Sequence, residues 1–183
     1  METDRLILRP WEPSDSEALY RYAKDPRIGP AAGWPPHSSV QESKTIIETV
    51  FSAPEIYAVV LRQTEEPVGC IGVLWGDQAN LPLSPGEGEL GYWVGGPYWG
   101  QGLIPEGVQA VLRHCFLELG CPGLWCGHYD GNRKSQRVQE KCGFLPQYSR
   151  TVPVPLLHEV RTEHVSYLSR TRWIQKWEGG QLR

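Results

Sequence analysis

The chain has 183 residues, of which 40% are hydrophobic and 21% charged, a composition typical of one globular domain rather than of a disordered chain. Its 18 basic and 21 acidic side chains give a formal net charge of −3, which provides no general attraction to nucleic acid. No apolar run approaches the length that a membrane span requires, and the charged residues after Met1 are not typical of a secretory signal.

The first half of the chain alternates strand-like and helix-like patterns, separated by stretches rich in proline and glycine. Pro10 is expected to stop the first strand, and a turn at residues 65–67 joins two others. Asp15 or Ser16 suits the start of the first helix. The expected elements are a strand at 5–9, a helix ending near Ala23, a loop at 25–38, a helix from Ser39, strands at 56–61 and 68–75, and a loop at 80–88.

The second half contains the clearest helical pattern of the chain. Pro105 suits the first turn of this helix, and Gly120 followed by Pro122 ends it. Asn132 is a suitable N-cap for a further helix, which Gly143 stops. The apolar face of the first of these helices is formed by Val108, Val111, Leu112, Cys115, Phe116 and Leu119. Strands are expected at 89–94, 124–129, 144–148 and 160–168, with a terminal helical turn around Trp173, Ile174 and Trp177.

The middle of the chain therefore reads β–loop–α–β–α–β, which predicts a mixed α/β fold. No internal repeat, low-complexity tract or linker interrupts the pattern. We expect a single domain over residues 1–183, in which residues 171–183 form a short helical tail.

Residues 88–107 read GELGYWVGGPYWGQGLIPEG, in which an alternating strand runs through a glycine-rich turn into a helix. The start of a helix has unpaired backbone N–H groups and partial positive charge, and it therefore binds phosphate without a cationic side chain. Gly100 and Gly102 allow the backbone to approach an anion closely. The pattern predicts a phosphate-bearing ligand at this turn.

Two other classes of phosphate-binding loop fit these residues less well. A Walker A loop requires lysine and a hydroxyl residue, whereas Gln101 and Gly102 follow Gly100. A dinucleotide fingerprint requires glycine at position 105, which is proline, and an acidic residue at the end of the next strand, which reads LWCGHY. An ordinary tight turn without a ligand stays open as an interpretation of this segment alone.

Four segments in order are similar to one known family: TDRLILRPWEPSDSEAL, GELGYWV, YWGQGLIPEG and NRKSQRVQEKCGF. The chain resembles the GNAT superfamily of acyl-CoA-dependent N-acetyltransferases, and most closely its RimJ/RimL-like branch, named for ribosomal-protein N-terminal acetyltransferases. Trp99 stands where the superfamily usually has Arg or Gln, and Ile104 where it usually has Gly or Ala. The resemblance implies an α/β (α+β) GNAT fold, with a twisted, mainly antiparallel mixed sheet and helices on both faces.

The resemblance also implies acetyl-CoA as the acetyl donor, bound in a central cleft, and no metal. In the family, the turn equivalent to residues 100–104 holds the pyrophosphate of CoA through backbone N–H groups, and the strand equivalent to 89–94 binds the pantetheine and the thioester carbonyl. Asn132 matches a family residue that contacts pantetheine. The cofactor-binding residues implied in this way are Trp93, Val94, Trp99, Gly100, Gln101, Gly102, Leu103, Ile104 and Asn132.

Direct acetyl transfer to a primary amine requires a neutral amine, a hydrogen-bond donor for the oxyanion and a proton for the departing thiolate. Ser135 stands where the family often supplies the hydroxyl that protonates the CoA sulfur, although it would equally complete the first turn of its helix. Glu89 is the candidate base, directly or through water; alternatively, it is a structural partner of Arg5 or Arg9. Glu106 is a second candidate, but a carboxylate in a first helical turn more often complements the helix dipole.

The expected acceptor is a protein N-terminus or a small-molecule amine. Trp34, Pro35 and His37 lie in the loop that lines the acceptor side in the family, although loop packing explains Trp34 and Pro35 equally well. His37 and His128 titrate near neutrality, but neither occupies a signature position, so surface or loop histidines are the better interpretation. A non-catalytic acyl-CoA-binding module of the same fold is the alternative function.

The five cysteines are odd in number and contain no CxxC pair, so neither a disulfide framework nor a zinc site is indicated. We expect small core residues rather than nucleophiles that carry the acetyl group. A reduced cytoplasmic protein is the resulting expectation, without membrane or general nucleic-acid partners. Aromatic residues near the C-terminus would suit the interface of a homodimer.

Overall fold

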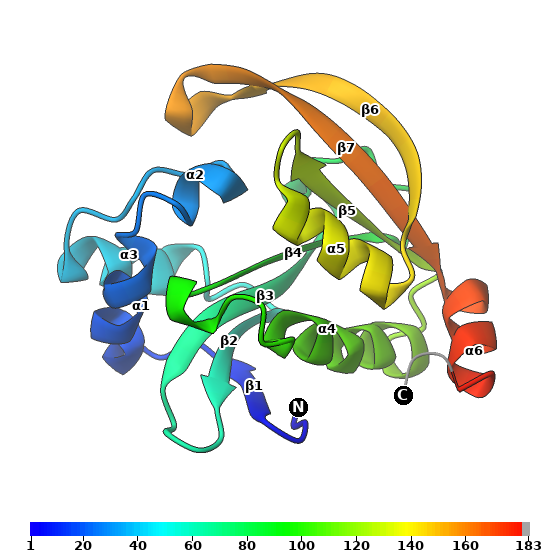
Figure 1. Cartoon of the computed structure of the whole chain (residues 1–183), viewed down its shortest axis with the longest axis horizontal. Coiled ribbons are helices and arrows are strands. Elements are labelled where there is room, and N and C mark those ends of the chain that lie inside the picture. The colour runs from blue at the N-terminus through cyan, green and yellow to red at the C-terminus, as the bar shows by residue number, and fades with distance from the viewer. Residues whose placement is uncertain (181–183) are drawn as a thin grey trace.

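One seven-stranded sheet organises the chain in the computed structural model, which describes residues 1–180 (Figure 1). The strand order is β1-β2-β3-β4-β5-β7-β6, and neighbours pair antiparallel except for β4 and β5, which are parallel. The strands are β1 (Leu6–Pro10), β2 (Ile56–Leu61), β3 (Pro67–Trp75), β4 (Gly88–Val94), β5 (Gly123–Tyr129), β6 (Leu145–Val154) and β7 (Glu159–Ser169).

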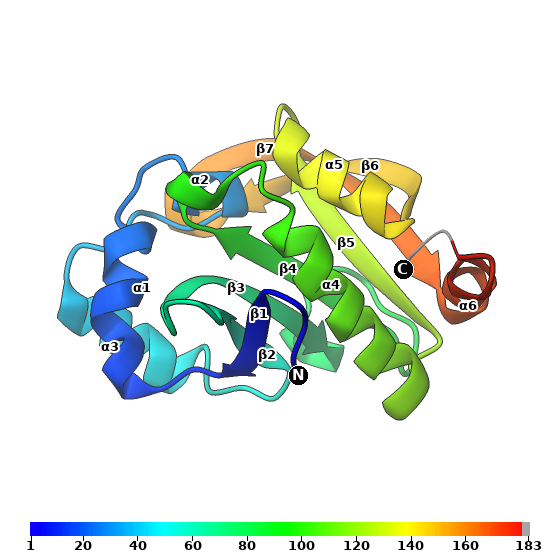
Figure 2. The same ribbon diagram turned by 60° about the horizontal axis from the view of Figure 1, so that its bottom comes forward.

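Helices cover both faces of this sheet, and the alternation of side chains along β2 shows why. Ala58 and Val60 pack in a cluster with residues of α1 and α3, whereas Val59 between them packs in the main core with α4. Figure 2 shows α4 and α5 side by side on one face of the sheet. The helices are α1 (Ser16–Ala23), α2 (Gly29–Ala32), α3 (Val40–Thr49), α4 (Leu103–Arg113, continued by a π-helical turn at His114–Glu118), α5 (Arg133–Cys142) and α6 (Arg170–Glu178). The expected mixed sheet with helices on both faces is confirmed.

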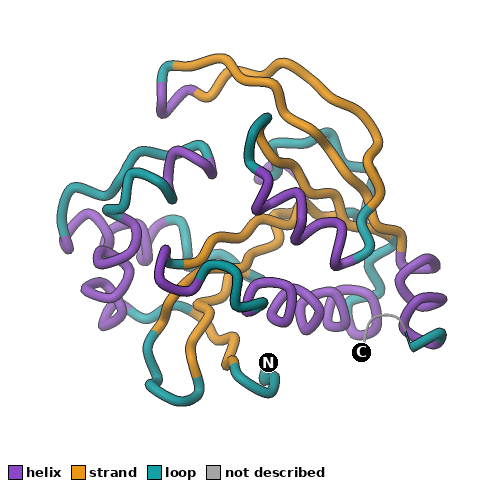
Figure 3. The backbone as a smooth tube through the Cα atoms, viewed as in Figure 1, coloured by secondary structure: helices purple, strands orange, loops and turns teal. Residues whose placement is uncertain are grey.

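The parallel pairing of β4 and β5 is very short. Only Gly88 with Leu124 and Glu89 with Trp125 lie in register, after which the two strands separate (Figure 3). The outer edge of β4 is paired with β3 along its length, and that of β5 with β7. The inner edges of both strands beyond Glu89 therefore keep backbone N–H and C=O groups that the sheet does not pair.

The chain differs from the sequence expectations at four places. Leu119, expected on the apolar face of the helix before Gly120, is 49% exposed, because the helical segment ends at Glu118. Pro10 is the last residue of β1 instead of the stop before it, because β1 is an edge strand that tolerates a missing N–H. Residues 25–38, expected as a loop, contain the short helix α2. The strand expected at 144–148 continues to Val154, because β6 is also an edge strand and accommodates Pro146 and Pro153.

As a result, β6 and β7 form a long curved hairpin, which we call the arm, that arches over the body toward α2 (Figure 1). At its far end, Arg161 Nη1 donates a hydrogen bond to the carbonyl oxygen of Pro30, at 2.5 Å. A Cβ placed on Gly33 would lie 3.5 Å from the Val154 side chain. The arm and α2 thus meet across the molecule, although more than 100 residues separate them in the sequence.

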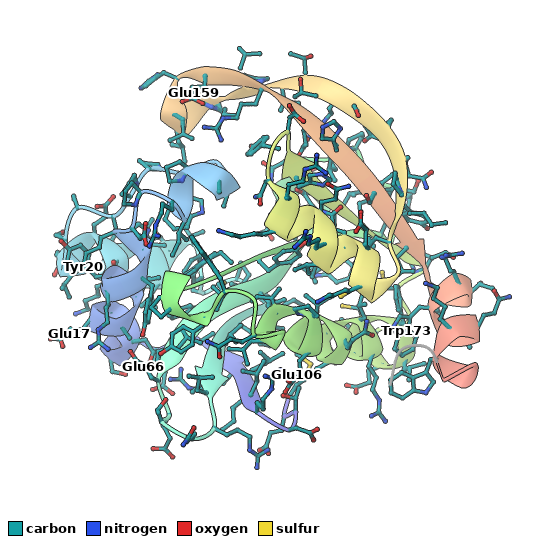
Figure 4. The ribbon with its side chains drawn as sticks, viewed as in Figure 1. Glu17, Tyr20, Glu66, Glu106, Glu159 and Trp173 are labelled. Atoms are coloured by element: carbon teal, nitrogen blue, oxygen red, sulfur yellow. The ribbon has the colours of Figure 1, made fainter. Side chains whose placement is uncertain are left out.

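Helix α6 is fixed to the body by Trp173, which is fully buried (Figure 4). Its ring lies 5.6 Å from that of Phe116, between centroids, and its indole N–H donates to Gln109 Oε1 at 3.1 Å. Residues 181–183, at the end of the expected tail, lie outside the described residues. A single domain over 1–183 stays our proposal. No helix within residues 1–180 is long and apolar enough to cross a membrane.

We predict that Trp173→Ala lowers the free energy of unfolding by about 3–5 kcal/mol, because it leaves a cavity against Phe116 and removes a buried hydrogen bond. Urea denaturation checks this value. Leu117→Ala, at a side chain that is 46% exposed on the same helical segment as Phe116, is the matched control and should change it by less than about 0.5 kcal/mol. A loss below 1 kcal/mol for Trp173→Ala would show that α6 docks only weakly on the body.

Candidate active site

A cavity of about 750 Å³ opens where β4 and β5 separate. Side chains from α2, β4, β5, α5 and the arm line it. Of the residues predicted from the sequence, those that line the cavity are Glu89, Trp93, Val94, Trp99, Ile104, Asn132 and Ser135. Those that do not are Trp34, Pro35, His37, Gly100, Gln101, Gly102 and Leu103.

The glycine-rich turn leads into α4 in the geometry that an anion site requires. Gly100 and Gly102 have φ angles of 76° and 77°, a left-handed conformation that a side chain would strain, and Gly102 is the N-cap of α4. A Cβ on Gly100 would meet no atom within 4 Å, so the space outside the turn is open. The first backbone N–H groups of α4 have no acceptor within the helix and are available to a phosphate.

Hydrogen bonds from side chains to backbone carbonyl groups fix the conformation of the glycine-rich turn. The Trp99 indole N–H donates to the carbonyl oxygen of Val94 at 3.0 Å, and Gln101 Nε2 donates to that of Pro97 at 2.9 Å. Arg5 Nη1 donates to the carbonyl oxygen of Gln101 at 2.9 Å. Ile104 is 5% exposed and belongs to the main core, so its branched side chain packs inward. The turn is therefore preorganised and presents its backbone outward.

Glu106 fixes the start of α4 to the segment just before β1 (Figure 4). Its carboxylate accepts hydrogen bonds from Thr3 Oγ1 at 2.6 Å, from the Arg5 backbone N–H at 3.0 Å and from Arg5 Nε at 2.6 Å. Partial burial acts to raise the pKa of Glu106, but the hydrogen bonds from Thr3 and Arg5 outweigh it and hold the pKa below the ordinary 4.5. Because Glu106 does not line the cavity, these contacts give it a structural role.

Two cations stand at the end of the cavity next to the glycine-rich turn. Lys134 Nζ lies 3.1 Å from the centroid of the Trp99 ring, and the guanidinium carbon of Arg27 lies 5.1 Å from it. Both side chains line the cavity, and Arg27 also pairs with Asp25 at 2.6 Å. This end of the cavity therefore suits an anionic group.

Two hydroxyl groups meet on the face of the sheet that α4 and α5 cover. Tyr92 Oη lies 3.0 Å from Ser135 Oγ and 3.1 Å from the Ser135 carbonyl oxygen. Burial raises the pKa of Tyr92 well above its usual value of 10.0, so the phenol stays protonated. When that single proton is donated to the Ser135 carbonyl, the Ser135 hydroxyl keeps its own proton for another acceptor. Sequence reasoning missed Tyr92, although alternation along β4 already placed it on the opposite face of the sheet from Glu89.

Gln139 connects this pair of hydroxyls to His128. Its Nε2 donates to Ser135 Oγ at 3.5 Å, and its Oε1 lies 3.2 Å from His128 Nδ1. Because an amide oxygen only accepts, this contact assigns the imidazole proton to Nδ1. Burial lowers the pKa of His128, which keeps the imidazole neutral. Asn132 caps α5 by accepting from the Ser135 backbone N–H at 3.2 Å, and its Nδ2 donates to the Ala31 carbonyl oxygen at 3.2 Å.

Carboxylates line the cavity on the other face of the sheet. Glu89 is 9% exposed, and its Oε2 accepts backbone N–H groups of Asn80 at 2.5 Å and Leu81 at 3.0 Å. It makes no ion pair with Arg5 or Arg9. Glu89 therefore orders the loop before β4 and still faces the cavity.

Glu163 of β7 and Arg150 of β6 are functional candidates that sequence reasoning missed. They lie directly opposite each other in the arm, with Arg150 Nε 2.7 Å from Glu163 Oε2. Arg150 Nη2 also donates to the Asn80 carbonyl oxygen at 3.1 Å. The strand expected at 144–148 stopped before Arg150, and only the register of the arm could have brought the two residues together.

Three residues expected on the acceptor side stand behind the cavity wall. Trp34 packs edge-on against Trp93, with ring centroids 5.9 Å apart, and His37 Nδ1 lies 2.8 Å from Ser43 Oγ. Burial lowers the pKa of His37, and Pro35 is exposed. Trp34 thus supports a residue that does line the cavity, and a direct role of these three residues toward an acceptor stays a prediction.

All five cysteines are buried and free. Cys126 lines the cavity, with its sulfur 3.9 Å from Tyr92 Oη. Burial raises the pKa of Cys126 far above the usual range, so its thiol is not a ready nucleophile. A covalent acetyl-cysteine route therefore has no support here.

Comparison with known proteins gives a consistent result. Residues 5–145 match the family described as Acetyltransferase (GNAT) domain. The uncharacterized N-acetyltransferase p20 of Bacillus licheniformis is 28% identical over 122 residues, which span 64% of this chain and 66% of p20. An acetyltransferase of the GNAT family from Bacillus anthracis superposes with a TM-score of 0.81 at 20% identity, covering 93% of this chain and 98% of that one. A protein assigned as a ribosomal-protein-serine acetyltransferase from Vibrio cholerae superposes with a TM-score of 0.75 at 24% identity, covering 92% and 95%.

We predict that Glu106→Gln destabilises the protein most at neutral pH. Because the folded protein holds the pKa of Glu106 below 4.5, its stabilisation is fully present above about pH 5 and disappears as the pH falls through the lowered value. Urea unfolding from pH 7 to pH 3 should show a difference from wild type of about 1 kcal/mol at pH 7 that shrinks toward pH 3. If the difference stays constant over this range, the loss of stability comes from packing and not from the charge of Glu106.

Proposed function

The chain belongs to the acetyltransferase (GNAT) family, and on this premise we propose that it moves an acetyl group from acetyl-CoA to a primary amine by direct transfer. The observation that carries the proposal is the order of groups along one cavity. Cations line the end of the cavity next to the start of α4, the hydroxyl of Ser135 lies on the face of the sheet that α5 covers, and Glu89 and Glu163 line the cavity on the opposite face. Donor binding, proton removal from the amine and proton donation to the thiolate can each be assigned to one of these groups.

The residues present fit acetyl-CoA. Its pyrophosphate is an anion that suits the free N–H groups of α4 together with Lys134 and Arg27. Its pantetheine arm carries amides, which suit the unpaired inner edges of β4 and β5 in the manner of an added strand. We assign Trp93, Val94 and Asn132 to this part of the ligand. When bound, acetyl-CoA supplies the activated acyl group of the reaction.

Glu89 is the proposed base. An alkyl ammonium with a pKa near 10.4 must lose a proton before its nitrogen can attack. Glu89 Oε1 accepts this proton directly or through a water molecule. The amine nitrogen then forms a bond to the carbonyl carbon, and the carbon–sulfur bond breaks. The attacking nitrogen loses a second proton to solvent, and Glu89 passes the first one to solvent. Since one proton returns through Ser135 to the thiolate, the overall reaction releases one proton.

Ser135 is the proposed acid. Its hydroxyl gives a proton to the departing thiolate and recovers one from solvent after product release. Tyr92 is a positioning residue in this scheme, because its contacts with the Ser135 hydroxyl and carbonyl fix the first turn of α5. No side chain carries the acetyl group, in agreement with the buried, protonated thiol of Cys126.

The acceptor in this proposal is either a protein N-terminus or a small-molecule amine. The motifs similar to the RimJ/RimL-like branch support a protein N-terminus, and the Vibrio cholerae protein assigned as a ribosomal-protein-serine acetyltransferase shares the fold. Reaction in the cytoplasm and a homodimeric state stay predictions from the sequence.

We predict that Ser135→Ala lowers kcat by about 10²-fold or more, because general acid catalysis typically contributes 10²–10⁴-fold, while the dissociation constant of acetyl-CoA stays within about threefold. Release of the CoA thiol, measured with an acetyl-CoA-saturated enzyme and a panel of amines, reports kcat. Isothermal titration with acetyl-CoA reports binding. Ser84→Ala, at an exposed serine outside the cavity, is the control and should behave as wild type.

An unchanged kcat for Ser135→Ala would remove this hydroxyl from the mechanism. Binding of acetyl-CoA without thiol release from any amine would instead favour a non-catalytic acyl-CoA-binding module. The Ser84→Ala control separates both outcomes from a general loss of folding.

A further inference from the structure

The surface of β4 has a gap at Gly91, in the middle of the face that carries Glu89 and Trp93. A Cβ added to Gly91 would meet no heavy atom within 4 Å. Its directly opposite neighbour on β3 is also a glycine, Gly72. Since the φ angle of Gly91 is not positive, the backbone does not require glycine here. The missing side chain leaves room above the strand, inside the cavity.

The charge next to this gap is negative and uncompensated. Glu89 makes no ion pair with any residue in the range 1–180. Its Oε2 accepts hydrogen bonds from the backbone N–H groups of Asn80 and Leu81. Its Oε1 accepts only one, from the side-chain nitrogen Nδ2 of Asn80, at 3.4 Å. The other carboxylate, Glu163, is neutralised by Arg150 at 2.7 Å. A nearly buried carboxylate with no ion pair, one oxygen of which accepts only a single long hydrogen bond, favours a cationic partner.

The arm also lines this cavity, with apolar side chains of Val152, Pro153, Val154 and Leu156 beside the ion pair of Arg150 and Glu163. The arm is tied to α2 by the hydrogen bond from Arg161 to the Pro30 carbonyl oxygen. Residues of the arm and of α2 both line the cavity, so this connection bounds the cavity on one side. A small body with no further chain fits beneath it.

We propose that the acceptor is a small primary amine with an uncharged, apolar alkyl or arylalkyl body, and that Gly91 sets the size of that body. This inference rests on the proposed acetyl transfer. The ammonium group lies at Glu89 Oε1, and the apolar body lies over Gly91 against the arm. An acceptor with a carboxylate beside its amine would place two negative charges together next to Glu89, and this arrangement selects against amino acids.

Gly91→Val tests the proposal without a change in the chemical groups of the site. Valine is favoured in strands, and the added methyl groups extend into open space, so the variant should fold as wild type. The acceptors to compare are ethylamine, phenethylamine, phenylalanine and a hexapeptide with a free N-terminal serine, all at saturating acetyl-CoA. Thiol release gives kcat/KM for each, and titration with acetyl-CoA checks that the donor still binds.

We expect wild type to prefer phenethylamine to ethylamine, and both to phenylalanine and the hexapeptide. Gly91→Val should lower kcat/KM for phenethylamine at least tenfold and that for ethylamine less than threefold, with unchanged binding of acetyl-CoA. Gly91→Ala should lie between these values. Glu89→Gln should lower kcat/KM for both small amines, whereas Glu65→Gln, at an exposed turn, should lower neither.

Equal losses for the two small amines in Gly91→Val would show that Gly91 does not set the size of the acceptor. Preference of wild type for the hexapeptide would overturn the acceptor class and leave acetyl transfer intact. Binding of acetyl-CoA without turnover of any acceptor would overturn the proposed function, and this inference with it.

Discussion

The separation of β4 and β5 is the constraint on which the rest of the site depends. Two parallel strands that pair at only two positions expose ladder N–H and C=O groups inside the protein, and such groups are costly unless something pairs with them. The fold stabilises this arrangement by pairing both outer edges fully and by covering one face of the sheet with α4 and α5 and the other with α1 and α3. The result is a cavity between strands that suits an extended, amide-bearing ligand.

Charge is divided along this cavity. Lys134, Arg27 and the start of α4 form a positive end, whereas Glu89 provides a negative charge on the opposite face of the sheet. The division fits the proposed reaction, in which the donor is anionic and the amine arrives as a cation that must lose a proton before it attacks the thioester carbon. Glu89 also serves structure, because it orders the loop before β4. Glu106 serves structure alone: it fixes the start of α4 to the segment before β1 and does not line the cavity.

Local patterns predicted most of the fold. Strand β2 lies where alternation placed it, at 56–61; α4 follows the apolar spacing from Val108; and Asn132 caps α5. The departures arise from edge strands, where neighbours and not the local sequence decide whether proline is tolerated, as in β6. Ser135 and Glu89, which are proposed from their segments, both line the cavity, and their catalytic roles stay predictions. Tyr92, Glu163 and Arg150 could not be proposed in this way, because their roles depend on contacts with α5 and on the register of the arm.

Thermal unfolding with and without acetyl-CoA tests the central claim, that the cavity between β4 and β5 binds a CoA thioester. A ligand at 100 times its dissociation constant stabilises the folded state by about 2.7 kcal/mol, which raises Tm by roughly 5–11 °C for a chain of this length. We expect this rise with acetyl-CoA and with CoA, and none with NAD. No rise with either CoA compound, or an equal rise with NAD, would contradict the assignment of the cavity.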